Sequence, residues 1–288
     1  MSMQIILGTA ALGSDYGINN KGLPFSDLYA RKILDSAREM NITALDTSPQ
    51  YGRAQEYIGN YHKENYQYEV FSKLPMGLED KPDLALECVA KSLEDMRISK
   101  LSGLYFHSAK NLLNVSHDAA MNTINDIAIS GLVESIGVSI YDSDELDQII
   151  SRFPKIDVIQ VPENIMDQRL MMSTTIRKAR FAGKRFFVRS VFLQGMLLMK
   201  PTECFSQGQD VNRGLRDLEE FSASLEVEPI DVCLSYLKHL GWADGAVIGI
   251  SRPEQLKRII NFKEIDLSNL RLPTPFTHEI SDPRNWSV

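Results

Sequence analysis

Residues 42–56, ITALDTSPQYGRAQE, contain the change from a strand pattern to a helix pattern that decides the fold. Ile42–Leu45 is a short apolar run of the kind that forms a buried parallel strand. Asp46 ends this run, a turn-rich segment follows, and the pattern becomes helical from Arg53. In parallel α/β folds, the carboxyl ends of the strands carry the chemistry. The stretch therefore predicts a carboxylate at a strand end, with Tyr51 in the loop above it.

The same strand–helix pattern repeats along the whole chain. Strands are predicted at residues 4–7, 42–45, 69–73, 103–107, 135–140, 157–161, 185–191 and 246–250. Helices are predicted at residues 25–40, 53–62, 82–96, 116–131, 144–150, 172–182, 212–225, 230–240 and 253–261. Eight strands followed by helices are typical of the α/β fold called the (β/α)8 TIM barrel. A doubly wound open sheet is the alternative, which the lack of a GxGxxG motif after the first strand disfavours.

Composition limits the domain organisation and the partners. No Pro/Gly/Ser-rich linker interrupts the 288 residues, so we expect one domain over residues 1–288, with residues 271–288 as a C-terminal tail. The net charge of −7 argues against nucleic acid or an anionic membrane as the main partner, but it permits an anionic small molecule. No apolar run approaches the ~20 residues of a membrane span. We expect a monomer or a small homo-oligomer.

The cysteines and the N-terminal residues indicate a compartment. Cys88, Cys204 and Cys233 lie far apart, as is usual for reduced thiols. The first residues, MSMQIILGTA, lack the basic segment of a signal peptide. We therefore expect a cytoplasmic protein. The five histidines are scattered, so no metal site is predicted.

Two later strands also end in residues that can take part in proton transfer. Lys73 ends the predicted strand 69–73, and His107 ends the strand 103–107. In a barrel these ends meet Asp46 and Tyr51 at one mouth. A phenol has a pKa near ~10, but a nearby ammonium lowers it, and a carboxylate keeps the ammonium charged. Tyr51 could then donate a proton to a developing alkoxide while His107 orients the carbonyl.

Each of these four residues also has an ordinary structural interpretation. A strand-end Asp usually caps a helix or bonds a loop, and a strand-end Lys is usually solvated. A lone His after an apolar strand is more often structural than catalytic. The functional interpretation is favoured because all four residue types occur at consecutive strand ends and together form one proton-transfer unit.

These motifs closely resemble those of the aldo-keto reductase family. ALDTSPQYGRAQE resembles the family's strand-2 signature, FSKLP its lysine segment and YFHSA its histidine segment. The resemblance assigns Asp46, Tyr51, Lys73 and His107 to the catalytic tetrad. It implies hydride transfer between NAD(P)H and an aldehyde, ketone or sugar carbonyl, on a barrel without a Rossmann domain.

Four further segments resemble the family's dinucleotide-binding segments, namely IGVS, IQVPEN, RSVFLQGML and VIGISRPEQL. The cofactor-binding residues implied by the resemblance are Ser139, Gln160, Arg189, Ser190, Leu193, Gly195, Gly249, Ser251, Arg252 and Gln255. Ser139 and Gln160 would contact the nicotinamide carboxamide. Ser190, Leu193 and Gly195 would lie near the pyrophosphate, and the last segment would hold the adenosine phosphate.

The chain departs from the family pattern at several of these positions. Ile140 stands where an Asn is frequent, and Arg189 stands where an aromatic ring commonly stacks under the nicotinamide. A guanidinium can also stack on a ring, or it can contact an anionic substrate. Gly249 and Gln255 stand where many members carry a Lys and an Arg for the 2′-phosphate. NADPH is the first cofactor implied by the family, and NADH is the alternative.

The tail and the charged loop residues lead to two further expectations. The tail after Leu270 is short, which predicts an open pocket mouth and a larger or sugar-like substrate. Five polar or charged loop residues could line the pocket, but we expect most of them to be solvated, namely Arg53, Gln55, Lys110, Arg213 and Arg284.

Two other functions remain open from the sequence. Some relatives of the family are nucleotide-sensing or stress proteins, so the chain could be a cofactor-binding regulatory module with little turnover. A barrel lyase or aldolase could instead use Lys73 as a Schiff base. The intact tetrad favours the reductase, because a pure binder has no need of the Tyr/Lys/Asp unit.

Overall fold

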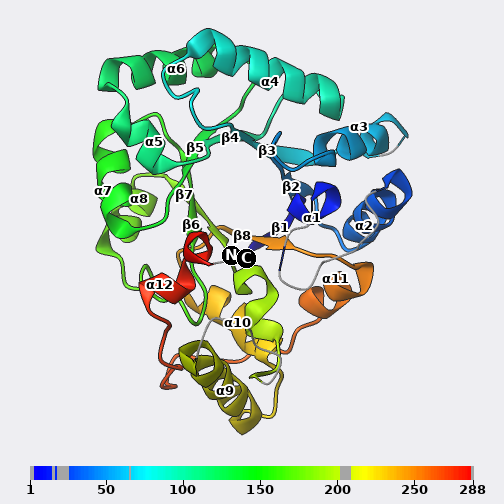
Figure 1. The fold of residues 1–288 in the computed structure, drawn as a ribbon, viewed down its shortest axis with the longest axis vertical. Coiled ribbons are helices and arrows are strands. Elements are labelled where there is room, and N and C mark those ends of the chain that lie inside the picture. Colours follow the sequence, from blue (N-terminus) through cyan, green and yellow to red (C-terminus); the bar gives the residue numbers. More distant parts are fainter. Residues whose placement is uncertain (1–2, 15–16, 18–25, 65, 202–208, 287–288) are drawn as a thin grey trace.

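The structure is a computed structural model, and it describes residues 3–14, 17, 26–64, 66–201 and 209–286. Eight parallel strands pair in sequence order, and the last strand pairs with the first, so the sheet closes into a barrel. The strands are β1 Gln4–Gly8, β2 Ala44–Asp46, β3 Glu69–Leu74, β4 Gly103–Phe106, β5 Ile136–Ser139, β6 Val158–Pro162, β7 Arg185–Arg189 and β8 Gly245–Gly249. Figure 1 shows the ring of helices around this barrel. The predicted single-domain (β/α)8 TIM barrel is confirmed.

The predicted helices form at nearly the expected positions. They are α2 Asp27–Glu39, α3 Ala54–Glu64, α4 Pro82–Met96, α6 His117–Ile129, α7 Ser143–Arg152, α8 Thr174–Phe181, α9 Gln209–Ser224, α10 Pro229–His239 and α11 Pro253–Ile260. The predicted start of the first of these, at Phe25, lies outside the described residues. None of the helices that the structure describes is long and apolar enough to cross a membrane.

Within the described residues, five short helices were absent from the sequence prediction. They are α1 Ala10–Gly13, α5 Ala109–Asn114, η1 Leu193–Leu198, α12 His278–Ser281 and η3 Pro283–Asn285. Helices of one or two turns are too short to show a 3.6-residue apolar period. They matter here because α1, η1 and η3 bring residues to the mouth of the barrel.

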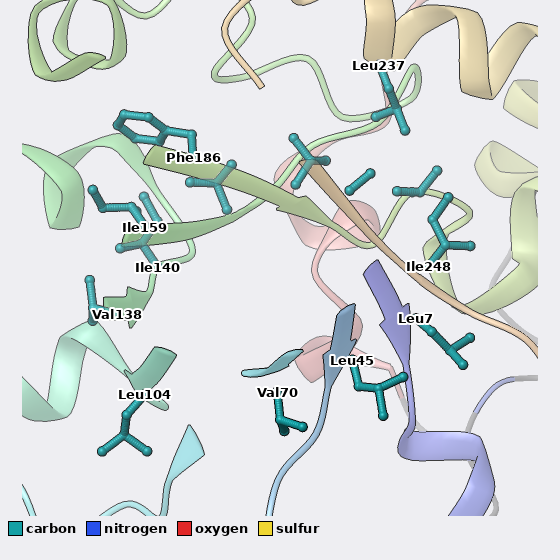
Figure 2. Packing of buried hydrophobic residues seen from close by; sticks show 14 of the residues in the cluster. Leu7, Leu45, Val70, Leu104, Val138, Ile140, Ile159, Phe186, Leu237 and Ile248 are labelled. Carbon is teal, nitrogen blue, oxygen red and sulfur yellow. The ribbon is translucent and has the colours of Figure 1, made fainter. Parts of the chain in front are cut away.

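Side chains alternate strictly between the two faces of each strand, as the geometry of a β-strand requires. The outward-facing residues form the main core between barrel and helices, and Figure 2 shows Leu7, Leu45 and Val70 among them. The inward-facing residues form a second, smaller cluster inside the barrel, consisting of Ile6, Ala44, Phe71, Tyr105, Val158 and Phe187. The barrel interior is therefore a packed layer that closes the floor beneath the mouth.

Candidate active site

A cavity of about 630 Å³ opens at the carboxyl ends of the strands. Its lining includes all four predicted catalytic residues, Asp46, Tyr51, Lys73 and His107. It also includes most of the residues predicted to bind a cofactor, namely Ser139, Gln160, Arg189, Ser190, Gly195, Gly249, Ser251 and Gln255. The structure therefore brings together residues from six strands and from the segments that follow β2, β4, β7 and β8.

The two-residue period of the strands explains why these side chains converge. The interior layer contains Ala44 on β2, Phe71 on β3 and Tyr105 on β4. Asp46, Lys73 and His107 lie two positions farther along the chain, so they face the same interior one step nearer the mouth. The same step leads from Val158 to Gln160 on β6 and from Phe187 to Arg189 on β7. Polar residues thus form the layer directly above the apolar floor.

Lys73 and Asp46 form a buried ion pair in this layer, with the two side chains 4% and 5% exposed. Lys73 Nζ also donates to the carbonyl oxygen of Thr47 at 3.3 Å, and Gln160 Nε2 donates to Asp46 Oδ2 at 2.8 Å. Burial alone lowers the pKa of Lys73, but Asp46 and Tyr51 outweigh burial and raise that pKa above its usual value. The Lys73 side chain is therefore a cation at neutral pH.

Tyr51 lies beside this pair, with Lys73 Nζ 5.2 Å from the centre of its ring. A cation at this position stabilises negative charge on the phenol oxygen. The ion pair is buried below, while Tyr51 is only partly buried and faces the cavity. Tyr51 is therefore placed to donate a proton into the cavity, with the Lys73 charge beneath it to stabilise the phenolate and Asp46 paired with Lys73.

His107 is held in its neutral form. Burial, followed by the positive charges of Lys73 and Arg189, lowers the pKa of His107 to about 4, and the Asp46 charge opposes this shift only in part. Nδ1 of His107 is buried and has no hydrogen-bond partner among the described residues. A neutral imidazole keeps one N–H donor for a ligand oxygen in the cavity.

Two glycines fix the loop that carries Tyr51. A Cβ atom on Gly13 of α1 would lie 1.9 Å from the carbonyl oxygen of Tyr51. A Cβ on Gly52 would lie 2.0 Å from the carbonyl oxygen of Gly13, and Gly52 has a positive φ of 52°. The backbones of α1 and of the Tyr51 loop therefore touch directly, which only glycine at both positions permits.

Arg189 spans from the end of β7 towards the end of β5. Its Nε donates to Ser139 Oγ at 3.3 Å and its Nη2 to the carbonyl oxygen of Ile140 at 3.0 Å. Its Nη1 donates to Ser190 Oγ at 3.2 Å, and its guanidinium lies 4.2 Å from the centre of the Tyr141 ring. Arg189 is therefore positioned among neutral groups at the β5 side of the cavity.

At the β8 side, Gln255 caps the start of α11 instead of facing a ligand freely. Gln255 Oε1 accepts from the backbone N–H of Ser251 at 2.7 Å and of Arg252 at 3.0 Å. Two of the cofactor-binding residues predicted from the resemblance do not line the cavity. Leu193 is fully buried in the core, and Arg252 is exposed at the N-cap of α11.

The short C-terminal tail reaches the cavity. The sequence instead predicted that a short tail would leave the mouth of the pocket open. Arg284 lines the cavity, contacts the Tyr141 ring at 3.5 Å and forms an ion pair of 2.5 Å with the buried Asp282. Arg169 fastens the tail through Ser281 Oγ at 3.1 Å and holds the carbonyl oxygen of Tyr141 at 3.2 Å. The tail thus forms part of the wall of the pocket.

Of the five loop residues expected to be mostly solvated, three are exposed as expected, namely Arg53, Lys110 and Arg213. Gln55 is buried and donates to Ser72 Oγ at 3.1 Å, while Arg284 is exposed but lines the cavity. The sequence analysis also did not include Tyr141, Phe192, Gln194 and Arg258, which are all lining residues. Tyr141 could have been found, because it follows the strand-end segment IGVS by two positions, whereas the others depend on loop conformation.

The cavity has the features that an extended anionic cofactor requires. Gly8 and Gly249 face each other on β1 and β8 and leave the backbone open at that end. Ser190 and Gln194 have positive φ values of 60° and 56°, a backbone strain that clusters at ligand sites. Among the lining residues that the structure describes, Asp46 is the only carboxylate, against four cations, Lys73, Arg189, Arg258 and Arg284. The residues present therefore fit a nicotinamide dinucleotide, whose phosphates are negative.

Comparison with known proteins agrees with this geometry. The model of the Aldo/keto reductase family matches residues 4–272. No curated protein matches the chain. An aldo-keto reductase from Bacillus halodurans, solved in its holo form, aligns with 96% of this chain over 89% of its own length. The two are 18% identical, with a TM-score of 0.74.

Two other solved structures have the same fold. A glycerol dehydrogenase from Gluconobacter oxydans is 16% identical over 92% of this chain and 88% of its own, with a TM-score of 0.73. A thermostable aldo-keto reductase in complex with the inhibitor epalrestat is 21% identical over 92% of this chain and 91% of its own, with a TM-score of 0.71. At these identities the structures establish a shared fold, and the family match covers nearly the whole sequence. The chain belongs to the Aldo/keto reductase family.

Proposed function

We propose that the protein is an NAD(P)H-dependent oxidoreductase that reduces an aldehyde, ketone or sugar carbonyl to the alcohol, or catalyses the reverse reaction. The observation that carries this proposal is the buried Lys73–Asp46 ion pair beside Tyr51 at the floor of the cavity. We further propose that the chain acts as one domain in the cytoplasm, as a monomer or a small homo-oligomer.

The proton in this proposal comes from Tyr51. As the carbonyl oxygen gains negative charge, the phenol O–H donates its proton to that oxygen and becomes a phenolate. The Lys73 ammonium stabilises the phenolate, and Asp46 keeps the ammonium charged and oriented. A bound nicotinamide dinucleotide supplies the hydride that the carbonyl carbon receives. The phenolate then recovers a proton from solvent.

His107 acts beside Tyr51 as a hydrogen-bond donor to the carbonyl oxygen. Because its pKa lies near 4, its imidazole is neutral and has one N–H at physiological pH. A neutral donor polarises the carbonyl without competing for the proton that Tyr51 delivers.

The charge state of Lys73 argues against the aldolase alternative. Schiff-base formation needs a neutral amine, whereas the raised pKa of Lys73 keeps it protonated. Its nitrogen is also engaged by Asp46 and by the Thr47 carbonyl oxygen. Lys73 is therefore suited to stabilise charge and unsuited to attack a carbonyl.

The cofactor would lie across the mouth from β5 to β8. Ser139 and Gln160 would contact the carboxamide, and the Ser190–Gly195 segment would hold the pyrophosphate. At the adenosine end, Ser251 and the α11 N-terminus would hold a phosphate once Gln255 swings off the backbone N–H groups that it now caps. NADPH is our first choice, with NADH as the alternative.

The test is an assay at 340 nm with a panel of aldehydes, ketones and aldoses, using NADPH and NADH in parallel. We expect turnover of several carbonyls, with a higher kcat/KM for NADPH. Tight binding of either cofactor without reduction of any carbonyl would instead support the regulatory module. Turnover confined to small aromatic aldehydes, with none on sugars, would exclude the sugar-like substrate.

Gly13→Ala is expected to lower kcat/KM by about tenfold or more, because a displaced proton donor loses its alignment with the carbonyl. The new Cβ would meet backbone atoms of Tyr51 and Ala54, at 1.9 and 2.7 Å, so the loop itself must move. Gly59→Ala is the matched control, since its Cβ would lie 1.9 Å from the Asp95 carbonyl oxygen, between α3 and α4. We expect both variants to have a lower Tm but only Gly13→Ala to lose kcat/KM. Equal kinetic losses in the two variants would show that the contact at Gly13 does not position Tyr51.

A further inference from the structure

Arg189 is a partly buried cation in the cavity that lacks an acidic partner. All its hydrogen bonds go to neutral oxygens, on Ser139, Ser190 and Ile140. Within the part of the chain that the structure describes, no carboxylate forms an ion pair with it. Withdrawing a charge from water is unfavourable unless an opposite charge compensates it.

The other cations that line the cavity are all paired. Lys73 is paired with Asp46, and Arg258 lies 2.6 Å from Glu228 and 2.7 Å from Asp231. Arg284 is paired with Asp282. Arg189 is therefore the lining cation whose charge is left for a ligand to balance.

One nitrogen of Arg189, Nη1, bonds Ser190 Oγ at 3.2 Å at the start of the loop after β7, but the rest of the guanidinium lies away from the predicted phosphate positions of the cofactor. The predicted phosphate-binding residues lie on the loop after β7 and at the end of β8. The other two nitrogens, Nε and Nη2, bond Ser139 and Ile140 at the end of β5, and the guanidinium packs on the Tyr141 ring there. Arg189 and His107 both line the cavity, and the Arg189 charge helps to lower the pKa of His107.

A second guanidinium reinforces the positive charge at this place. Arg284 contacts the same Tyr141 ring at 3.5 Å, and Arg189 contacts it at 4.2 Å. The ring therefore has two cationic groups beside it, and only one of them has a carboxylate partner. In a protein of net charge −7, such a local excess of positive charge has a specific use.

We propose that the substrate is a carbonyl compound that carries a carboxylate or a phosphate, and that Arg189 binds this anionic group, with Arg284 beside it. This inference rests on the proposed function, because it names the substrate class of the same site. The planar guanidinium suits both anions, since its N–H groups can donate in pairs to two oxygens. The Tyr141 ring keeps the guanidinium in place and forms an apolar wall for the rest of the substrate.

The kinetic test compares each anionic aldehyde with an uncharged counterpart. The first pair is 4-carboxybenzaldehyde and its methyl ester, methyl 4-formylbenzoate. The second pair is 4-formylphenyl phosphate and 4-methoxybenzaldehyde. We expect kcat/KM to favour the anion of at least one pair by about tenfold or more, the effect of a charge-assisted hydrogen bond. The pair with the larger ratio distinguishes a carboxylate from a phosphate.

Variants connect this preference to the side chain. Arg189→Gln should abolish the preference by raising KM for the anion, and Arg189→Lys should restore part of it. Arg284→Gln should reduce it less, because Asp282 already neutralises that charge. Lys178→Gln is the charge-matched control, since Lys178 is exposed on α8 and does not line the cavity, and it should keep the full preference.

Binding of unreactive analogues gives a readout that does not need turnover. Calorimetry on the NADPH-loaded protein should detect 4-methylbenzoate but not its methyl ester, and Arg189→Gln should lose the signal.

If esters and acids are reduced equally well, the anion site is wrong while the reductase stands. If no carbonyl is reduced but 4-methylbenzoate binds through Arg189, the reductase is wrong while the anion site stands. If Arg189→Gln weakens NADPH binding and keeps the substrate preference, Arg189 serves the cofactor and the inference is overturned.

Discussion

Tyr51→Phe is expected to lower kcat/KM for carbonyl reduction by about 10²–10⁴-fold, the usual contribution of a positioned general acid. The variant keeps the ring beside Lys73 and removes only the hydroxyl group. Binding of NADPH should therefore stay within about twofold of the wild-type value. Both quantities can be measured on one preparation, the rate at 340 nm and the Kd by fluorescence titration.

Tyr105→Phe is the matched control for this prediction. Tyr105 also lies close to Asp46, but it is only 1% exposed, in the packed layer inside the barrel. Burial and the Asp46 charge raise the pKa of its phenol well above the usual value, and no described residue bonds its hydroxyl group. This variant should keep wild-type activity. A loss in Tyr105→Phe as large as that in Tyr51→Phe would contradict the assignment of Tyr51 as the proton donor.

Lys73→Met is expected to abolish activity and to lower the free energy of unfolding by about 3–5 kcal/mol at pH 7, the cost of breaking a buried pair. Without the ammonium, the buried Asp46 carboxylate retains the Gln160 amide as its partner but has no opposite charge. Urea unfolding monitored by circular dichroism measures the loss. Activity should fall because the Tyr51 phenolate is no longer stabilised.

The double variant Lys73→Met/Asp46→Asn provides the control. Removing both charges leaves no buried ion, so most of the lost stability should return while activity stays absent. Additive losses in the two single variants and the double variant would mean that the two side chains do not stabilise each other. In that case the charge on Lys73 would need another explanation.

The barrel itself was predictable because its signals are local. Each strand is an apolar run, and each main helix has an apolar face that repeats every three to four residues. Closure agrees with the number of βα units, since eight consecutive units are typical of the closed barrel, and the missing GxGxxG motif disfavoured an open sheet. The strand ends shift by one or two residues; for example, the second strand is Ala44–Asp46 where Ile42–Leu45 was expected.

The floor of the site was predictable for the same reason, whereas its walls were not. Asp46, Lys73 and His107 follow apolar strand residues by a fixed step of two, so their convergence is dictated by the strand period. Arg284 comes from a tail 143 residues beyond its neighbour Tyr141, and no periodic pattern links them. The cap that Gln255 places on α11 likewise depends on a side-chain conformation.

The most direct test of the account uses NADPH that carries deuterium on the transferable position of its nicotinamide ring. Mass spectrometry of the product alcohol then shows whether the label reaches the former carbonyl carbon. We predict complete transfer of one deuterium by the wild-type protein, and transfer by Tyr51→Phe that is slower by about 10²–10⁴-fold. NADPH binding without any labelled product from any carbonyl of the panel would contradict the proposed oxidoreductase.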